Sequence, residues 1–152
     1  MNRHVGQADV GHQAIHLAAQ GTGGAVPVHY LHRGLAPPQL VAAHATAAAL
    51  LVTPLIDGMN LVAKEYVTVQ QARQGCRSLV LSEFTGAAAE LGEAVSCNPF
   101  DVEGLSELIE YALELPEARR RSDLAAMARR VQCYDVHQWV TDQLAAIASR
   151  GN

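Results

Sequence analysis

Two acidic residues, Asp57 and Glu65, flank a short segment that carries a glycine and an asparagine. Gly58 lets a ligand or another backbone approach closely, because it has no side chain. Asn60 is a credible helix N-cap, whose side-chain oxygen accepts a hydrogen bond from the first turn. The first N–H groups of a helix lack internal partners and lie at the positive end of its dipole. The segment therefore predicts a site for a phosphate or diphosphate.

The two carboxylates indicate what else this ligand carries. They would repel a phosphate, so we expect Asp57 and Glu65 to accept hydrogen bonds from the hydroxyls of a sugar or ribose. Phosphate on backbone amides, with hydroxyls on carboxylates, describes a nucleotide-sugar. The residues alone leave a second interpretation open: a structural strand-to-helix turn whose acids only favour the start of the helix.

The flanking residues predict a strand, a tight loop and a helix. The apolar run 49–52 is typical of a strand buried on both faces of a parallel sheet. Pro54 ends that strand, because proline cannot donate to a sheet. A turn follows at Asp57 and Gly58, where glycine is free to adopt positive φ. Apolar spacing then predicts a helix from Asn60 to about Arg73.

Strands and helices alternate along the chain, which predicts an α/β fold with a Rossmann-like parallel sheet and helices on both faces. We expect further strands at 26–31, 78–81 and 94–97, and helices at 38–48, 85–91, 102–113, 116–131 and 135–149. Ligands then lie beyond the carboxyl ends of the strands, where residues 57–60 and 83–86 stand. Residues 1–24 form a poorly defined N-terminal segment, with a short helix at 14–20 and a glycine-rich linker at 21–24. Residues 25–150 form the domain.

The chain resembles the trehalose-6-phosphate synthases, which are retaining glycosyltransferases of the GT-B fold. The resemblance is carried by Leu-Val-Thr-Pro-Leu at 51–55 and by Asp-Gly-Met-Asn-Leu-Val-Ala-Lys-Glu-Tyr-Val at 57–67. It continues at 79–91 and 98–104, and 27–31 also fit. A match in this order and spacing is more specific than a single glycine motif. It implies that the chain holds most of the C-terminal, nucleotide-sugar-binding half of a GT-B fold.

The resemblance implies a role for each residue of the motif. Asp57 matches the acid that holds hydroxyls of the donor glucose, and Glu65 matches the acid that binds the ribose. Leu35 matches a position near the nucleotide base. The backbone that approaches the donor sugar and diphosphate is matched by Gly58, Met59, Asn60, Leu61 and Val62. We expect Lys64 to be an exposed helix lysine and Phe84 to belong to the core.

By the same resemblance, the reaction transfers glucose from UDP-glucose, or another nucleoside-diphosphate glucose, to glucose 6-phosphate with retained configuration. Catalysis in this scheme is mainly positioning and charge stabilisation, without a metal or cofactor. The resemblance does not extend to the family's acceptor-binding N-terminal domain, nor to the arginine and lysine that neutralise its leaving diphosphate. Ile56 also stands where the family commonly has an arginine.

We therefore expect no complete catalytic site in this chain. One interpretation is an enzyme portion, either truncated or completed by another chain that supplies the N-terminal domain. The others are a non-catalytic nucleotide-sugar-binding or regulatory module, and a degenerate fragment. In the last helix, an apolar stripe at 3–4 spacing is expected to be partly exposed or covered only by self-association. It comprises Val136, Trp139, Val140, Gln143, Leu144 and Ile147.

Composition is typical of a soluble globular protein: 152 residues, 49% hydrophobic, with mean hydropathy +0.06. A net charge of −4 and a pI near 5.9 disfavour binding to nucleic acid or an anionic membrane. Cys76, Cys97 and Cys133 lack C-x-x-C spacing. We expect them to be reduced thiols of a cytoplasmic protein, with no signal peptide and no membrane span.

Overall fold

The computed structural model describes residues 28–150. Contacts divide the chain into two compact units, residues 1–35 and 36–152, a division that lies after the predicted boundary at residue 24. The helix predicted at 14–20 and the linker at 21–24 lie outside the described residues. The strand predicted at 26–31 is wrong for its described part, because residues 28–31 carry no strand. An extended segment becomes a strand only when its backbone pairs with a neighbour.

The second unit contains a parallel sheet of three strands in the order β1-β2-β3. The strands are β1 (Ala49–Val52), β2 (Ser78–Ser82) and β3 (Val95–Cys97). The register pairs Ala49 with Ser78 and Val80 with Val95. The predicted parallel sheet is therefore confirmed, with each strand within one residue of its predicted bounds at either end.

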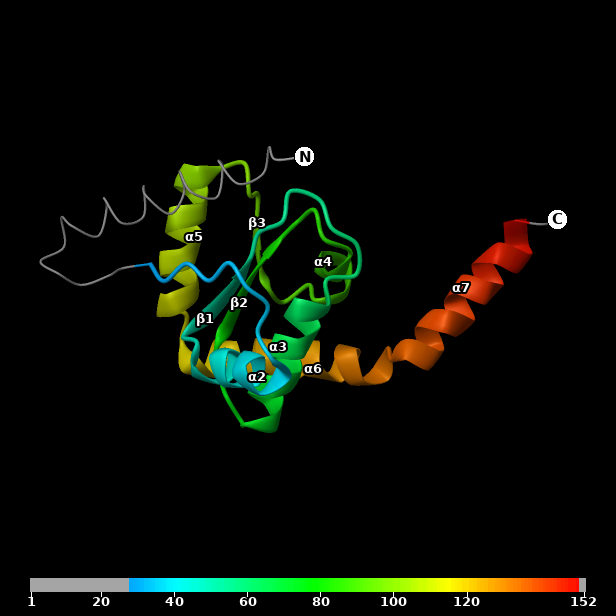
Figure 1. Ribbon diagram of the computed structural model, residues 1–152, viewed down its shortest axis with the longest axis horizontal. Coiled ribbons are helices and arrows are strands. Elements are labelled where there is room, and N and C mark those ends of the chain that lie inside the picture. Colours follow the sequence, from blue (N-terminus) through cyan, green and yellow to red (C-terminus); the bar gives the residue numbers. More distant parts are fainter. Residues whose placement is uncertain (1–27, 151–152) are drawn as a thin grey trace, which may run out of the picture. The chain divides into compact units, whose positions relative to one another are not determined.

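Helices precede, connect and follow these strands (Figure 1). They are α2 (Pro37–Thr46), α3 (Leu61–Ala72), α4 (Gly86–Glu90), α5 (Val102–Glu114), α6 (Glu117–Cys133) and α7 (Val136–Arg150). Side-chain caps explain several starts: Thr85 accepts a hydrogen bond from the Ala88 amide, and Asp101 accepts one from the Gly104 amide. These helices confirm the alternating pattern predicted from the sequence.

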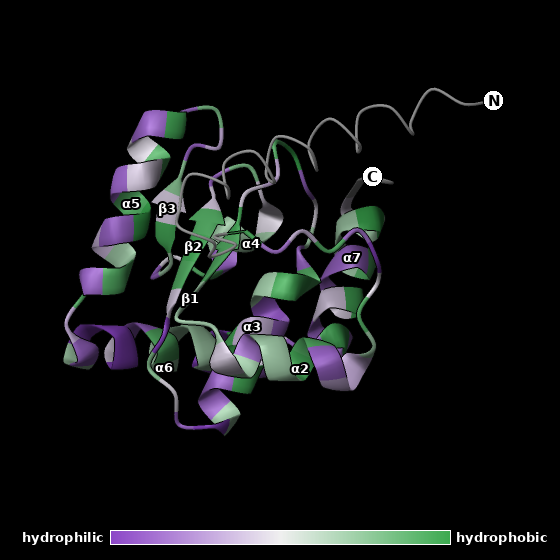
Figure 2. Cartoon of the chain, turned by 60° about the vertical axis from the view of Figure 1, so that its left-hand side comes forward, coloured by the Kyte–Doolittle hydropathy of each residue, from purple (hydrophilic) through white to green (hydrophobic). Residues whose placement is uncertain are grey.

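Helices cover both faces of the sheet, as predicted. Side chains alternate along β2, so that Leu79 and Leu81 pack in a core with α3, α4 and α6. Val80 faces the other way and packs with Cys97 and Ala112, in a core shared with α5. In Figure 2 the middle of the sheet is hydrophobic, whereas α5 alternates between polar and apolar residues.

The prediction that β1 is buried on both faces is wrong. β1 lies at an edge of the sheet among the described residues, and only Val52 of its four residues is buried. Leu51 is 38% exposed. A strand with a neighbour on one side only cannot bury both faces as fully as the central strand does.

The apolar stripe of α7 is exposed, as predicted for part of it. Leu144 is 63% exposed, Ile147 is 69% exposed and Trp139 is 37% exposed. Figure 1 shows α7 extending beyond the end of α6. Between residues 28 and 150, no helix combines the length and the apolar character needed to cross a bilayer.

Candidate functional site

Asn60 caps α3, and its backbone makes the turn into that helix. Its side-chain oxygen accepts a hydrogen bond of 3.1 Å from the Ala63 amide, which confirms the predicted N-cap. Asn60 has φ 49° and ψ 76°, in the left-handed region. Gly58, which is free to adopt positive φ, does not do so here. Asparagine takes this role because its short polar side chain tolerates the left-handed conformation better than most residues do.

The Asp57 carboxylate is bound within the same loop. One oxygen accepts a hydrogen bond from the Gly58 amide at 2.7 Å, and the other accepts one from the Asn60 side-chain amide at 2.5 Å. Each carboxylate oxygen has a second lone pair, so both can still accept a ligand hydroxyl. Asp57 is exposed, which leaves that capacity available.

The first turn of α3 presents free donors beside this carboxylate. Within the described part of the chain, the Leu61 and Val62 amides have no acceptor, since only the Ala63 amide is capped. Leu61 is 56% exposed and Val62 is 44% exposed. These N–H groups at the positive end of the helix dipole are suited to an anion.

The neighbouring loop holds this one by backbone hydrogen bonds. The Asp57 amide donates to the Phe84 carbonyl at 3.2 Å, and the Gly86 amide donates to the Gly58 carbonyl at 2.7 Å. A parallel bridge joins Asp57 and Thr85. The loops that follow β1 and β2 are thus joined at the carboxyl end of the sheet, where the sequence predicted a ligand site.

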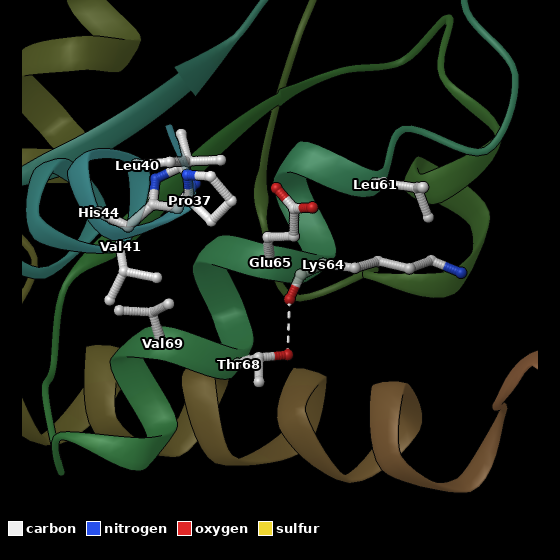
Figure 3. Close-up of a pocket in the computed structure, with 9 residues that line it drawn as sticks. All are labelled: Pro37, Leu40, Val41, His44, Leu61, Lys64, Glu65, Thr68 and Val69. Atoms are coloured by element: carbon white, nitrogen blue, oxygen red, sulfur yellow. Dashed lines mark hydrogen bonds between the residues drawn. The ribbon is translucent and has the colours of Figure 1, made fainter. Parts of the chain in front are cut away.

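Glu65 lies one turn further along α3, beside an open pocket of about 360 Å³ between α2 and α3. Figure 3 shows its carboxylate on the side of α3 that faces α2, whereas Lys64 extends away from α2. Glu65 makes no hydrogen bond or ion pair with any described residue. The pocket is lined by Pro37, Leu40, Val41, His44, Leu61, Lys64, Glu65, Thr68 and Val69.

Sequence reasoning missed the α2 side of this pocket. Leu40, Val41 and His44 lie on one face of α2, at the spacing i, i+1 and i+4. That spacing indicates, from the sequence alone, that the three side chains share one face of a helix. His44 is 4% exposed, and its ring lies edge-on to the Tyr66 ring, with 5.7 Å between the ring centres. The His44 carbonyl accepts a 2.6 Å hydrogen bond from Gln70, which fixes α2 against α3.

Two predictions about neighbouring side chains are wrong. Lys64 is 13% exposed rather than solvated, because its ammonium pairs with Glu90 and lies 6.0 Å from the centre of the Tyr134 ring. Phe84 is 39% exposed rather than part of the core, and its ring packs edge-on against Phe100. In both cases the side chain contacts a residue far away in the sequence, which local patterns do not indicate.

Leu35 belongs to the first unit, so its place beside a nucleotide base stays a prediction. Among residues 28–150, no three histidine, cysteine, aspartate or glutamate side chains gather as they do around a metal ion. The site as described therefore consists of the loop 57–60, the start of α3 and the pocket beside Glu65.

Comparison with known proteins finds a matching family and several relatives of this chain. The sequence pattern of glycosyltransferase family 20 matches residues 18–149. Trehalose-6-phosphate synthase of Mycolicibacterium vanbaalenii is 47% identical over 144 residues, which covers 93% of this chain and 29% of the relative. The Mycobacterium leprae protein of the same name is 46% identical over 143 residues, or 92% and 28% of the two chains.

Solved structures show the same fold. The E. coli structure bound with UDP-2-fluoro glucose has a TM-score of 0.78 at 35% identity, covering 91% of this chain and 32% of that one. An α,α-trehalose-phosphate synthase from Burkholderia xenovorans, in complex with glucose-6-phosphate, has a TM-score of 0.74 at 35% identity and the same coverage. The predicted match to part of a GT-B fold is confirmed. The chain spans about 29% of the length of the first curated relative.

Proposed function

This chain belongs to glycosyltransferase family 20, and we propose that it is the donor-binding portion of a trehalose-6-phosphate synthase-like glycosyltransferase. Residues 25–150 are proposed to be a partial GT-B C-terminal domain that binds UDP-glucose or another nucleoside-diphosphate glucose. The same portion, acting without catalysis as a nucleotide-sugar-binding or regulatory module, is the alternative.

One observation carries the proposal: the order of chemical groups along the start of α3. The Asp57 carboxylate comes first, the free amides of Leu61 and Val62 follow, and Glu65 stands one turn later beside an apolar pocket. A nucleotide-sugar has the same order, from sugar hydroxyls through a diphosphate to a ribose and a base. We propose that each part binds the matching group.

The assignment of residues follows this order. Asp57 accepts hydrogen bonds from the donor glucose, and Glu65 accepts them from the ribose. The base takes the pocket between α2 and α3. The assignment of Leu35 to the nucleotide base rests on the family resemblance alone. The sugar and diphosphate lie against the backbone of Gly58, Met59, Asn60, Leu61 and Val62.

The reaction proposed for the complete enzyme is glucose transfer to glucose 6-phosphate. Two relatives support these substrates, since one solved structure is bound with UDP-2-fluoro glucose and another is in complex with glucose-6-phosphate. We propose that another chain supplies the domain with the acceptor site, that this chain can also self-associate, and that no metal or cofactor takes part. Cys76, Cys97 and Cys133 are free thiols, which supports the cytoplasm as location.

Calorimetric titration with UDP-glucose tests the donor site. We expect Asp57→Ala and Glu65→Ala to weaken binding about tenfold or more, because hydrogen bonds to a charged group contribute about 1.5–3 kcal/mol. Glu107→Gln, on the exposed part of α5, is the control and should bind as wild type does. Equal binding by wild type and both site variants would contradict the assignment and favour a degenerate fragment.

A further inference from the structure

The loop that carries Asp57 is not held by the hydrophobic core. Leu55 is 57% exposed, Ile56 is 88% exposed and Met59 is 39% exposed. Among residues 28–150, the Asp57 side chain bonds to Gly58 and Asn60 alone, and both belong to the same loop. Apolar burial therefore does little to fix this loop, and its position depends on hydrogen bonds from elsewhere.

Those hydrogen bonds come from residues 82–86, here called the clamp. At its first residue, the Ser82 side chain is fully buried. Its hydroxyl donates to the Pro54 carbonyl at 2.8 Å and accepts from the Phe84 amide at 3.2 Å. One buried hydroxyl thus joins the end of β2 to the residues that follow β1.

At the other end of the clamp, two glycines approach closely. The Gly86 amide donates to the Gly58 carbonyl at 2.7 Å. A Cβ atom at Gly86 would lie 2.6 Å from that same oxygen, closer than such atoms ever approach. At Gly58 and at Gly92, by contrast, an added Cβ would meet nothing within 4 Å. The close approach therefore requires glycine at position 86.

We propose that Ser82 and Gly86 are positioning residues for the donor sugar, which they orient by fixing the backbone of residues 54–58. This proposal rests on the function proposed above. Neither residue needs to contact the ligand: the clamp sets where the Asp57 carboxylate and the Gly58 carbonyl lie. The Glu65 carboxylate is not held by the clamp, because it stands on α3 after the loop.

Because the clamp fixes Asp57 but does not hold Glu65, a change in the clamp should affect the binding of UDP-glucose and of UDP differently. UDP binds through the diphosphate, ribose and base, whereas UDP-glucose also needs the sugar contact of Asp57. Loss of the clamp's hydrogen bonds should therefore lower the affinity for UDP-glucose more than the affinity for UDP. A merely structural role would lower both affinities alike.

The test compares Gly86→Ala with Gly92→Ala. The second variant adds the same methyl group just after the C-terminal end of α4, where it meets open space. Calorimetry gives the dissociation constants for UDP-glucose and UDP. We expect Gly86→Ala to weaken the binding of UDP-glucose about tenfold and the binding of UDP less than threefold. Gly92→Ala should change neither dissociation constant. Ser82→Ala should raise the ratio of the UDP-glucose dissociation constant to the UDP dissociation constant in the same way. It replaces Gly86→Ala in the test if Gly86→Ala does not fold. An unchanged ratio in the folded variants would overturn the proposal.

Hydrogen exchange separates this proposal from the function on which it rests. In the ligand-free protein, we expect the Asp57 and Gly86 amides to be protected in wild type and Gly92→Ala, and to exchange faster in Gly86→Ala. If wild type binds neither nucleotide, the proposed function fails. The clamp is then judged by exchange alone, and equal exchange in all variants overturns it.

Discussion

The ammonium of Lys64 lies 2.6 Å from a carboxylate oxygen of Glu90, with the two side chains 13% and 30% exposed. Lys64 is the only lysine or arginine between residues 34 and 72. Its charge is already compensated, so β1, its loop and α3 offer no free cation to a diphosphate. The proposed donor binding at α3 would then depend on backbone amides and on the helix dipole.

The first prediction is that this chain alone makes no detectable trehalose 6-phosphate. Loss of a group that stabilises transition-state charge commonly lowers rates by about 10² to 10³, and the one lysine of β1, its loop and α3 is already paired with Glu90. Purified chain is incubated with UDP-glucose and glucose 6-phosphate, and products are identified by mass spectrometry. Trehalose 6-phosphate above the level of a heat-treated sample would refute this expectation.

The second prediction concerns the left-handed cap of α3. Asn60→Ala should lower the free energy of unfolding by about 2 kcal/mol, since it loses the cap and places alanine at positive φ. Asn60→Gly should cost less, because glycine adopts positive φ without strain. Urea unfolding measures both variants.

The matched control is Asp101, which caps α5 at φ −94°. There the alanine variant should not be strained, so Asp101→Ala and Asp101→Gly should be destabilised to more similar extents. If Asn60→Gly proves as unstable as Asn60→Ala, the left-handed conformation contributes nothing to the difference.

The third prediction is a pH dependence at Glu93. A hydrogen bond from Arg130, at 2.8 Å, holds the pKa of the Glu93 carboxyl below its ordinary value of 4.5. Stability from this pair is therefore present above pH 4.5 and is lost as the pH falls through the lower pKa of the folded state. Wild type should be more stable than Glu93→Gln at pH 7.

Urea midpoints measured between pH 7 and pH 3 test this sign. The difference between wild type and Glu93→Gln should stay constant down to about pH 5 and shrink below the ordinary glutamate pKa. A difference that grows as the pH falls would show that the sign is wrong.

The fourth prediction concerns the exposed stripe of α7. Trp139 and Leu144 belong to an apolar surface, and such surfaces commonly mark an interface. We expect concentration-dependent association in sedimentation, with increasing protection of Trp139 from a quencher. Leu144→Gln should weaken both effects. A chain that stays monomeric, with Trp139 already protected at the lowest concentration, would contradict a partner surface.

Sequence patterns predicted the elements well where local signals are strong. The run before Pro54 gave β1, and the caps Asn60 and Asp101 gave the starts of α3 and α5. Contacts between distant residues were beyond the sequence. The Lys64–Glu90 pair joins side chains 26 positions apart, and no local pattern indicates it.

Backbone conformation was the second feature that the sequence patterns did not predict. Glycine is the usual residue at positive φ, so the sequence does not indicate that Asn60, rather than Gly58, adopts this conformation. Gly86 is needed for a different reason, since the Gly58 carbonyl approaches it from the neighbouring loop. Only the folded arrangement of β1 beside β2 brings these two glycines together.

The central claim, a nucleotide-sugar bound along the start of α3, is tested most directly by mapping backbone amide chemical shifts during a titration with UDP-glucose. We predict that the largest changes lie at residues 57–65, with a second group at residues 37–44, which line the pocket beside Glu65. The control is free glucose, which should leave residues 61–65 unchanged. Changes confined to α5 and α6, or no changes at any UDP-glucose concentration, would contradict the account.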